Sequence, residues 1–166
     1  MSRPIAVLAA TCLPWHRFGG LERHVFQLCR WLRKRDVEVD LFTSAPENDV
    51  DPFAGDAGFR LLVVPGTPFL RRPSTVILSR STLYPLFSLR MGRRVGDEAG
   101  RRGYAAVIAQ GMAGFGYAVW AAPRASAAPL LLNPQGMEEA LTPNPWKRAA
   151  YALFRALTRF AAAWVS

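Results

Sequence analysis

The sequence predicts an α/β protein with a Rossmann-like, doubly wound parallel sheet that carries helices on both faces. Ile5–Ala10 and Arg60–Pro65 contain short continuous apolar runs, which are typical of parallel strands buried on both faces. The segment between them repeats apolar residues at helical spacing, at Leu21, Val25, Leu28, Cys29 and Leu32. A chain of 166 residues, 51% of them hydrophobic, is long enough for one domain with a full core.

The first unit reads strand, glycine turn, helix, strand, which is a βαβ unit. It runs from Ile5–Ala10 through the pair Gly19-Gly20 and a helix with Glu22 in its first turn to the strand Val37–Thr43. In open α/β sheets, ligands bind at the carboxyl ends of the strands, where this glycine turn is expected. Glycine lets a ligand approach the backbone, and the free N–H groups of a first helical turn favour an anion or a sugar hydroxyl. A plain tight turn explains the glycine pair equally well.

The loop Thr11–Phe18 follows the first strand at the same edge. Its aromatic residues either line a pocket or cover the end of the sheet. His16 is a candidate catalytic base, although no neighbour in the sequence would orient it. His24 is expected to be a packing or helix-surface residue. Cys12 and Cys29 lie in apolar surroundings, so we expect reduced core thiols rather than a disulfide or a metal site.

The rest of the chain continues the alternation of strands and helices. Residues Tyr104–Ala122 carry no charge, but Gln110 and the glycines favour a strand, a loop and a buried helix over a membrane span. We expect a loop at Ser44–Gly58, one or two helices broken near Pro85 within Val76–Arg102, a strand at Ala105–Ala109, a helix at Gly114–Ala122 packed through Phe115, Val119 and Trp120, a strand at Pro129–Leu132, a helix at Trp146–Ala163 with Phe160 on its core side, and a final strand from Ala163.

The net charge is +9 and comes almost entirely from arginine. The segment Arg71–Arg102 holds eight arginines against two acidic residues. A nucleic acid, an anionic membrane surface or a phosphate-bearing substrate would each suit this excess, as would an ordinary basic surface. The residues that we expect to contact a membrane or another anion are Arg71, Arg72, Arg80, Arg90, Arg93 and Arg94.

The opening of the chain resembles the N-terminal domain of GT4-type retaining glycosyltransferases, which have the GT-B fold. The order of the later segments fits as well, so the resemblance covers nearly the whole chain. The residues that carry it are Gly19-Gly20-Leu21-Glu22-Arg23-His24-Val25, then Leu28, Leu32, Arg35-Asp36-Val37-Glu38-Val39 and Phe42-Thr43.

The resemblance implies which residues line the substrate cleft: Gly19, Gly20, Glu22, Gln110, Gly111, Gln135, Gly136 and Glu138. Gln135 stands where many members of the family have a histidine near the donor sugar. Glutamine can bond to a sugar hydroxyl but cannot take its proton, which the leaving phosphate can accept instead. The resemblance thus implies no firm catalytic residue, no metal and no cofactor, only a nucleotide-sugar co-substrate.

The resemblance also implies a division of labour between two domains. Residues 1–166 would be the acceptor-binding half of a two-domain enzyme, without the C-terminal donor-binding domain, and inactive alone. That partner would be supplied in cis or as a separate subunit, and the acceptor would be a glycan or a lipid-linked sugar. We expect a cytoplasmic protein, peripheral at the inner face of the membrane, with no nucleic-acid partner. The alternative is a non-catalytic basic α/β module or a regulatory subunit that binds an anionic membrane surface or a nucleic acid.

Overall fold

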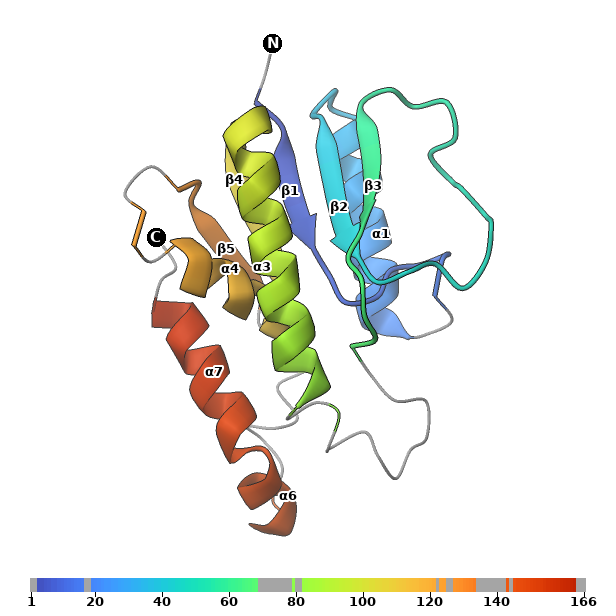
Figure 1. The fold of residues 1–166 in the computed structure, drawn as a ribbon. Coiled ribbons are helices and arrows are strands. Elements are labelled where there is room, and N and C mark those ends of the chain that lie inside the picture. Colours follow the sequence, from blue (N-terminus) through green and yellow to red (C-terminus); the bar gives the residue numbers. More distant parts are fainter. Residues whose placement is uncertain are drawn as a thin grey trace.

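The computed structural model describes residues 3–16, 19–68, 79, 82–121, 123–124, 127–133, 143 and 145–163. In this part of the chain, five parallel strands form one sheet in the order β3-β2-β1-β4-β5 (Figure 1). The strands are β1 (Ile5–Leu8), β2 (Val39–Thr43), β3 (Phe59–Val63), β4 (Ala106–Gln110) and β5 (Leu130–Asn133). The predicted fold class is confirmed.

Helices cover both faces of the sheet, with α1 on one face and α3 on the other (Figure 1). The apolar stripe of α1 packs on β1 and β2, where Val25, Cys29 and Leu32 are buried against Val7 and Leu41. The helices are α1 (Gly20–Arg33), α3 (Leu83–Arg102), the short 3₁₀ helix η2 (Gly111–Gly114), α4 (Phe115–Ala121), α6 (Pro145–Ala150) and α7 (Ala152–Ala163).

Both cysteines lie in the core beneath α1 as free thiols, as the sequence predicts. Burial raises the pKa of the Cys29 thiol to about 12 and moves the pKa of Cys12 even further above its usual range. Since the thiolate is the reactive form, both side chains act as small apolar residues near neutral pH.

Helices α3 and α4 cross in direct backbone contact because glycines stand at the crossing. A Cβ built on Gly92 would overlap the backbone of Gly116, and one on Gly116 would overlap the carbonyl of Ser88. The Ser88 hydroxyl donates to the Met112 carbonyl and accepts from the Gly116 N–H, both at 2.8 Å. The crossing therefore leaves no space for a side chain at either glycine.

Four sequence predictions about the helices are wrong. Pro85 does not break a helix, because it lies in the first turn of α3, where a missing N–H costs no intrahelical bond. The predicted helix at Trp146–Ala163 is divided into α6 and α7 at Tyr151. Val119 is 39% exposed instead of packed on the sheet. Phe160 is 40% exposed and makes an edge contact with Phe115. The predicted final strand, Trp164 onward, lies outside the described residues.

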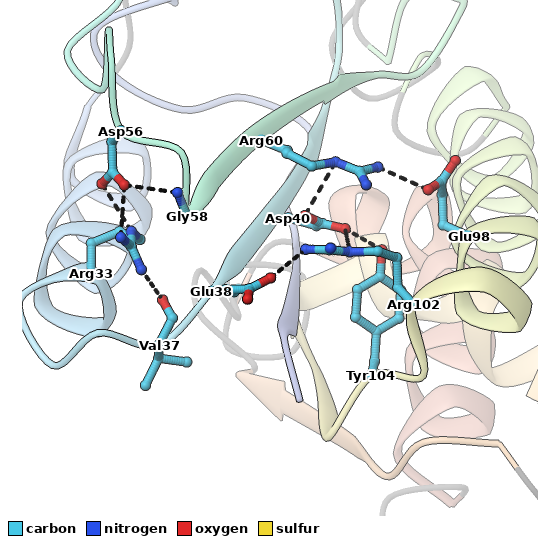
Figure 2. Close-up of polar contacts among 10 residues, drawn as sticks. All are labelled: Arg33, Val37, Glu38, Asp40, Asp56, Gly58, Arg60, Glu98, Arg102 and Tyr104. Carbon is cyan, nitrogen blue, oxygen red and sulfur yellow. Dashed lines mark hydrogen bonds and ion pairs between the residues drawn. The ribbon is translucent and has the colours of Figure 1, made fainter. Parts of the chain in front are cut away.

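A network of charged side chains joins the amino ends of the strands to α3 (Figure 2). Asp40 of β2 has no exposed surface, accepts a 2.6 Å hydrogen bond from the Tyr104 hydroxyl, and lies 3.5 Å from the Nε atoms of both Arg60 and Arg102. Arg60 also donates to Glu98 at 2.8 Å, and this bond holds the pKa of the Glu98 carboxyl below its usual range. The network ties β2 and β3 to the last turn of α3.

A second ion pair fixes the end of α1 to the loop before β3. Arg33 donates two hydrogen bonds to the carboxylate of Asp56, at 2.7 and 2.8 Å, and a third to the Val37 carbonyl (Figure 2). The Asp56 carboxylate also accepts from the N–H of Gly58. The hydrogen bonds from Arg33 lower the pKa of Asp56.

In the part of the chain that the structure describes, no helix combines the length and the apolar composition needed to cross a membrane.

Candidate functional site

The carboxyl edge of the sheet has a switch point between β1 and β4. These two strands are neighbours, with Leu8 in register with Ala109, yet the chain leaves β1 toward α1 on one face and leaves β4 toward α4 on the other. Diverging connections of this kind open a crevice where α/β proteins bind ligands. The predicted residues Gly19, Gly20, Gln110 and Gly111 all lie in the two connections at this edge.

The amino end of α1 is open on this edge. Gly19 is its N-cap residue, makes no side-chain cap bond, and is exposed together with Gly20. A Cβ built on either glycine would meet nothing within 4 Å. The first-turn N–H groups of a 14-residue helix thus have no side-chain cap, which is the arrangement that favours an anion.

Glu22 lies beneath this opening rather than in it. Its side chain is buried, and its carboxylate accepts a 2.8 Å hydrogen bond from the hydroxyl of Thr11. Its backbone carbonyl accepts from the N–H of Leu13. Glu22 therefore holds the loop after β1 against the first turn of α1, a structural role that the sequence pattern did not separate from ligand binding.

His16 is also a structural residue of this loop. It is 2% exposed, and both ring nitrogens are used inside the protein. Nδ1 lies 3.0 Å from both the backbone nitrogen and the carbonyl oxygen of Cys12, and Nε2 lies 3.0 Å from the Ser44 hydroxyl and 3.2 Å from the Ala45 carbonyl. The imidazole joins the loop to the end of β2, so the hypothesis of a catalytic base has no geometric support.

Gln110 ends β4 in an environment that does not satisfy its side chain. It is 1% exposed, and neither its amide oxygen nor its amide nitrogen has a hydrogen-bond partner among the described residues. Leaving a buried donor or acceptor unpaired costs about 1–3 kcal/mol per group. The next residue, Gly111, has a φ of +52° and turns the chain into η2, a conformation that favours glycine.

Asn133, at the end of β5, is a residue of this edge that the sequence analysis did not select. It is in register with Gln110, and its amide donates a 3.2 Å hydrogen bond to Nε2 of His24 on α1. The signal that could have found it is its position directly after the apolar run of β5, where a polar residue marks the carboxyl end of a strand.

The remaining predicted residues are divided between the described and the undescribed parts of the chain. Gln135, Gly136, Glu138, Arg71, Arg72 and Arg80 lie outside the described residues. The other three arginines, Arg90, Arg93 and Arg94, are exposed along one stripe of α3 together with Leu86 and Leu89. Arg93 and Leu89 also line a shallow groove between α3 and α4, opposite Val119 and Trp120.

Comparison with known proteins decides the family. Residues 19–166 match the model of the glycosyl transferase 4-like domain. The chain belongs to this family. The match begins at the first of the two exposed glycines, so the open end of α1 and the connection after β4 are both parts of a glycosyl transferase 4-like domain.

Solved structures that resemble this glycosyl transferase 4-like domain share its fold. Sucrose-phosphate synthase from Thermosynechococcus elongatus aligns over 94% of this chain and 40% of its own, with 15% identity and a TM-score of 0.58. WaaG, a glycosyltransferase involved in lipopolysaccharide biosynthesis, aligns over 94% and 35%, with 16% identity and a TM-score of 0.50. The chain thus spans less than half the length of either protein. No curated protein sequence matches it significantly.

Proposed function

We propose that this chain is the acceptor-binding half of a glycosyltransferase that moves a sugar, with retention, from a nucleotide-sugar donor to a glycan or a lipid-linked acceptor. The family match carries this proposal, and the open amino end of α1 at the switch point supports it. A diphosphate leaving group needs hydrogen-bond donors that are already oriented, and the N–H groups after Gly19 and Gly20 offer them.

The chemistry needs little acid–base work from this half of the enzyme. Donors fixed around the departing diphosphate stabilise the negative charge that develops as the glycosidic bond breaks. The leaving phosphate can accept the proton of the acceptor hydroxyl, so an amide such as Gln135 suffices at the position where many members of the family have a histidine. We propose that the reaction uses no metal or other cofactor held by this chain.

The second half of the enzyme would bind the donor. This chain aligns with 40% and 35% of the two solved neighbours, which leaves most of each of those proteins unmatched. We expect a donor-binding domain in cis or as a separate subunit, and no sugar transfer by residues 1–166 alone.

A membrane-bound acceptor is consistent with the outer stripe of α3. Leu86 is 53% exposed and Leu89 is 39% exposed, and arginines follow them on the same stripe. Apolar residues next to arginines suit the surface of an anionic bilayer. We therefore propose a cytoplasmic protein that is peripheral at the inner face of the membrane. Liposome binding should require anionic lipid and weaken as salt is raised, and Arg93→Glu should reduce it.

Transfer by the complete two-domain enzyme tests the proposed activity. A panel of radiolabelled nucleotide sugars with a membrane-extract acceptor should give a labelled product. Gly20→Val should keep the fold, since a Cβ there meets nothing within 4 Å, but should lower transfer at least about tenfold by blocking the approach to the N–H groups. Gly100→Ala, on open surface of α3, is the matched control and should leave transfer unchanged. Binding to anionic surfaces without transfer of any sugar would instead favour a non-catalytic module.

A further inference from the structure

The unpaired amide of Gln110 requires an explanation, because native proteins leave few buried polar groups unsatisfied. Both of its polar atoms are shut off from water, so each bears a desolvation cost that the described structure does not repay. Such a cost is tolerated at sites where a ligand supplies the missing partners.

The amide lies beside two further polar side chains. Gln110 and Asn133 are register partners on neighbouring parallel strands, so their side chains point to the same face of the sheet. Ala109 and Leu132 belong to the core under α3 and α4, so by alternation the face of Gln110 is that of α1. His24 of α1 reaches the same place, because it accepts a hydrogen bond from Asn133.

The chemistry of this cluster suits hydroxyl groups better than phosphate. An amide offers one acceptor and two donors, which matches a hydroxyl that both donates and accepts. The diphosphate of a nucleotide sugar offers only acceptors, so it could use the amide N–H groups but would leave the Gln110 carbonyl unpaired. With Nε2 of His24 3.2 Å from the Asn133 amide nitrogen, Nδ1 is the second polar atom of the ring.

We propose that Gln110, Asn133 and His24 form a hydroxyl-recognising subsite for a sugar, separate from the anion-binding amino end of α1. Asn133 and His24 are positioning residues at the entrance, because His24 is exposed and Asn133 is half-buried. Gln110 is the residue that discriminates among sugars. A hydroxyl that reaches its buried amide gains two bonds in a place without competing water. The inference rests on the proposed glycosyltransferase function and assigns residues to its sugar.

Histidine NMR of the whole chain tests this subsite, because the protein has only two histidines. His24 is the reporter, and His16, buried with both nitrogens bonded, is the internal control. The probes are methyl glucopyranoside, methyl galactopyranoside and methyl mannopyranoside, which differ in the orientation of single hydroxyls. At pH 7.5, at least one should shift the His24 ring signals and the Gln110 side-chain amide signals and leave His16 unchanged. If none shifts them, the proposal is wrong.

Variants separate recognition from structure. Gln110→Leu should abolish the sugar-induced shift of His24 and leave the midpoint of thermal unfolding unchanged or raised, since it removes two unpaired groups. Gln27→Leu, on the exposed face of α1, is the matched control and should keep the shift. If Gln110→Leu does not fold, Asn133→Ala supplies the test and should weaken sugar binding several-fold. A Gln110→Leu protein that unfolds at lower temperature but keeps the sugar response would show that the amide is structural.

Inorganic phosphate and UDP distinguish this inference from the broader function. Either should shift the backbone amide signals of Gly19 and Gly20 without shifting the His24 ring. Phosphate binding without a sugar response would overturn the hydroxyl subsite and leave the glycosyltransferase proposal standing. Loss of both responses would contradict the two proposals together.

Discussion

The amino and carboxyl ends of the parallel strands differ in how their polar side chains are paired. At the amino edge, charged side chains pair with one another: Asp40 lies between Arg60 and Arg102, and Glu98 takes bonds from Arg60 and Arg101. At the carboxyl edge, the Glu22 carboxylate and the His16 ring hold the loop after β1 through single hydrogen bonds to hydroxyl groups, while the amide of Gln110 stays unpaired.

This difference suggests that the amino edge mainly stabilises the fold and that the carboxyl edge mainly binds ligands. A buried carboxylate such as Asp40 is tolerable because cations and a hydroxyl surround it, so the amino edge contributes to stability. Two buried atoms of this network, Asp40 Oδ1 and Arg102 Nε, have ion-pair partners at 3.5 Å but no hydrogen bond. The carboxyl edge keeps unpaired donors and acceptors at some cost in stability, which is typical of functional sites. Mutations at the two edges should therefore fall into two classes, one affecting stability and one affecting binding.

Asp40→Ala should be the most damaging change at the amino edge. It leaves Arg60, Arg102 and the Tyr104 hydroxyl without their shared partner, and we expect a loss of about 3–5 kcal/mol in the free energy of unfolding. Urea denaturation followed by circular dichroism measures it. Asp49→Ala, on an exposed loop, should stay within about 0.5 kcal/mol of the parent. Equal losses in the two variants would refute a cohesive role for the buried carboxylate.

His16→Ala should be the largest effect on stability at the carboxyl edge. It leaves the Cys12 N–H and the Ser44 hydroxyl without the ring and opens a cavity, so we expect a loss of about 2–3 kcal/mol. The matched variant His24→Ala removes an exposed ring and should cost well under about 1 kcal/mol. If the two histidines proved equally dispensable for folding, the structural role of His16 would be wrong.

Tyr104→Phe and Tyr117→Phe together compare a hydrogen bond that a carboxylate accepts with one that a neutral carbonyl accepts. The Tyr104 hydroxyl donates to a carboxylate, so its removal should cost about 2 kcal/mol. The Tyr117 hydroxyl donates to the Ala128 carbonyl at 2.9 Å, and Tyr117→Phe should cost about 1 kcal/mol. Thermal unfolding of both variants gives the order, and a reversed order would contradict the strength assigned to the charged network.

The free energy of unfolding should depend on pH through the ionisation of the Glu98 carboxyl. The pKa of Glu98 is lowered in the folded state, chiefly by the hydrogen bond from Arg60. The ionised carboxyl therefore stabilises the fold fully above the ordinary carboxyl pKa of about 4.3. That contribution is lost as the pH falls through the lower folded pKa. Glu98→Gln should therefore cost about 1 kcal/mol at pH 7, and the difference from the parent should shrink below about pH 4. A difference that stays constant down to pH 2 would exclude this linkage.

The fold could be predicted because its signals are local. Continuous apolar runs identify the strands, and the spacing of Val25, Cys29 and Leu32 identifies the buried stripe of α1. The failure at Pro85 has a simple cause, because a proline within a helical pattern reads as a break unless the helix start is known. The exposure of Val119 depends on where α3 crosses α4, which periodicity does not contain.

The site could be predicted only as far as the edge to which it belongs. The family resemblance implies the glycine pair and Gln110 as site residues, and the parallel sheet explains why they lie at one edge, since each follows or ends a strand. Glu22 and His16 carry the chemistry of ligand contacts, and only the three-dimensional positions of Thr11 and Ser44 show their structural use. The hydrogen bond between Asn133 and His24 joins residues 109 positions apart, so no local sequence pattern predicts it.

The contact between Gly92 and Gly116 has a consequence for how this sequence can vary. A Cβ at either position would overlap backbone of the other helix, so even alanine should be rejected at both. Leu89, one turn before Gly92, and Arg93, the next residue, are exposed. In a library that randomises α3 and is screened only for folded protein, position 92 should return almost nothing but glycine. Its exposed neighbours should accept many different amino acids. The positions of α3 that accept only glycine would therefore locate the helix crossing from sequence data alone.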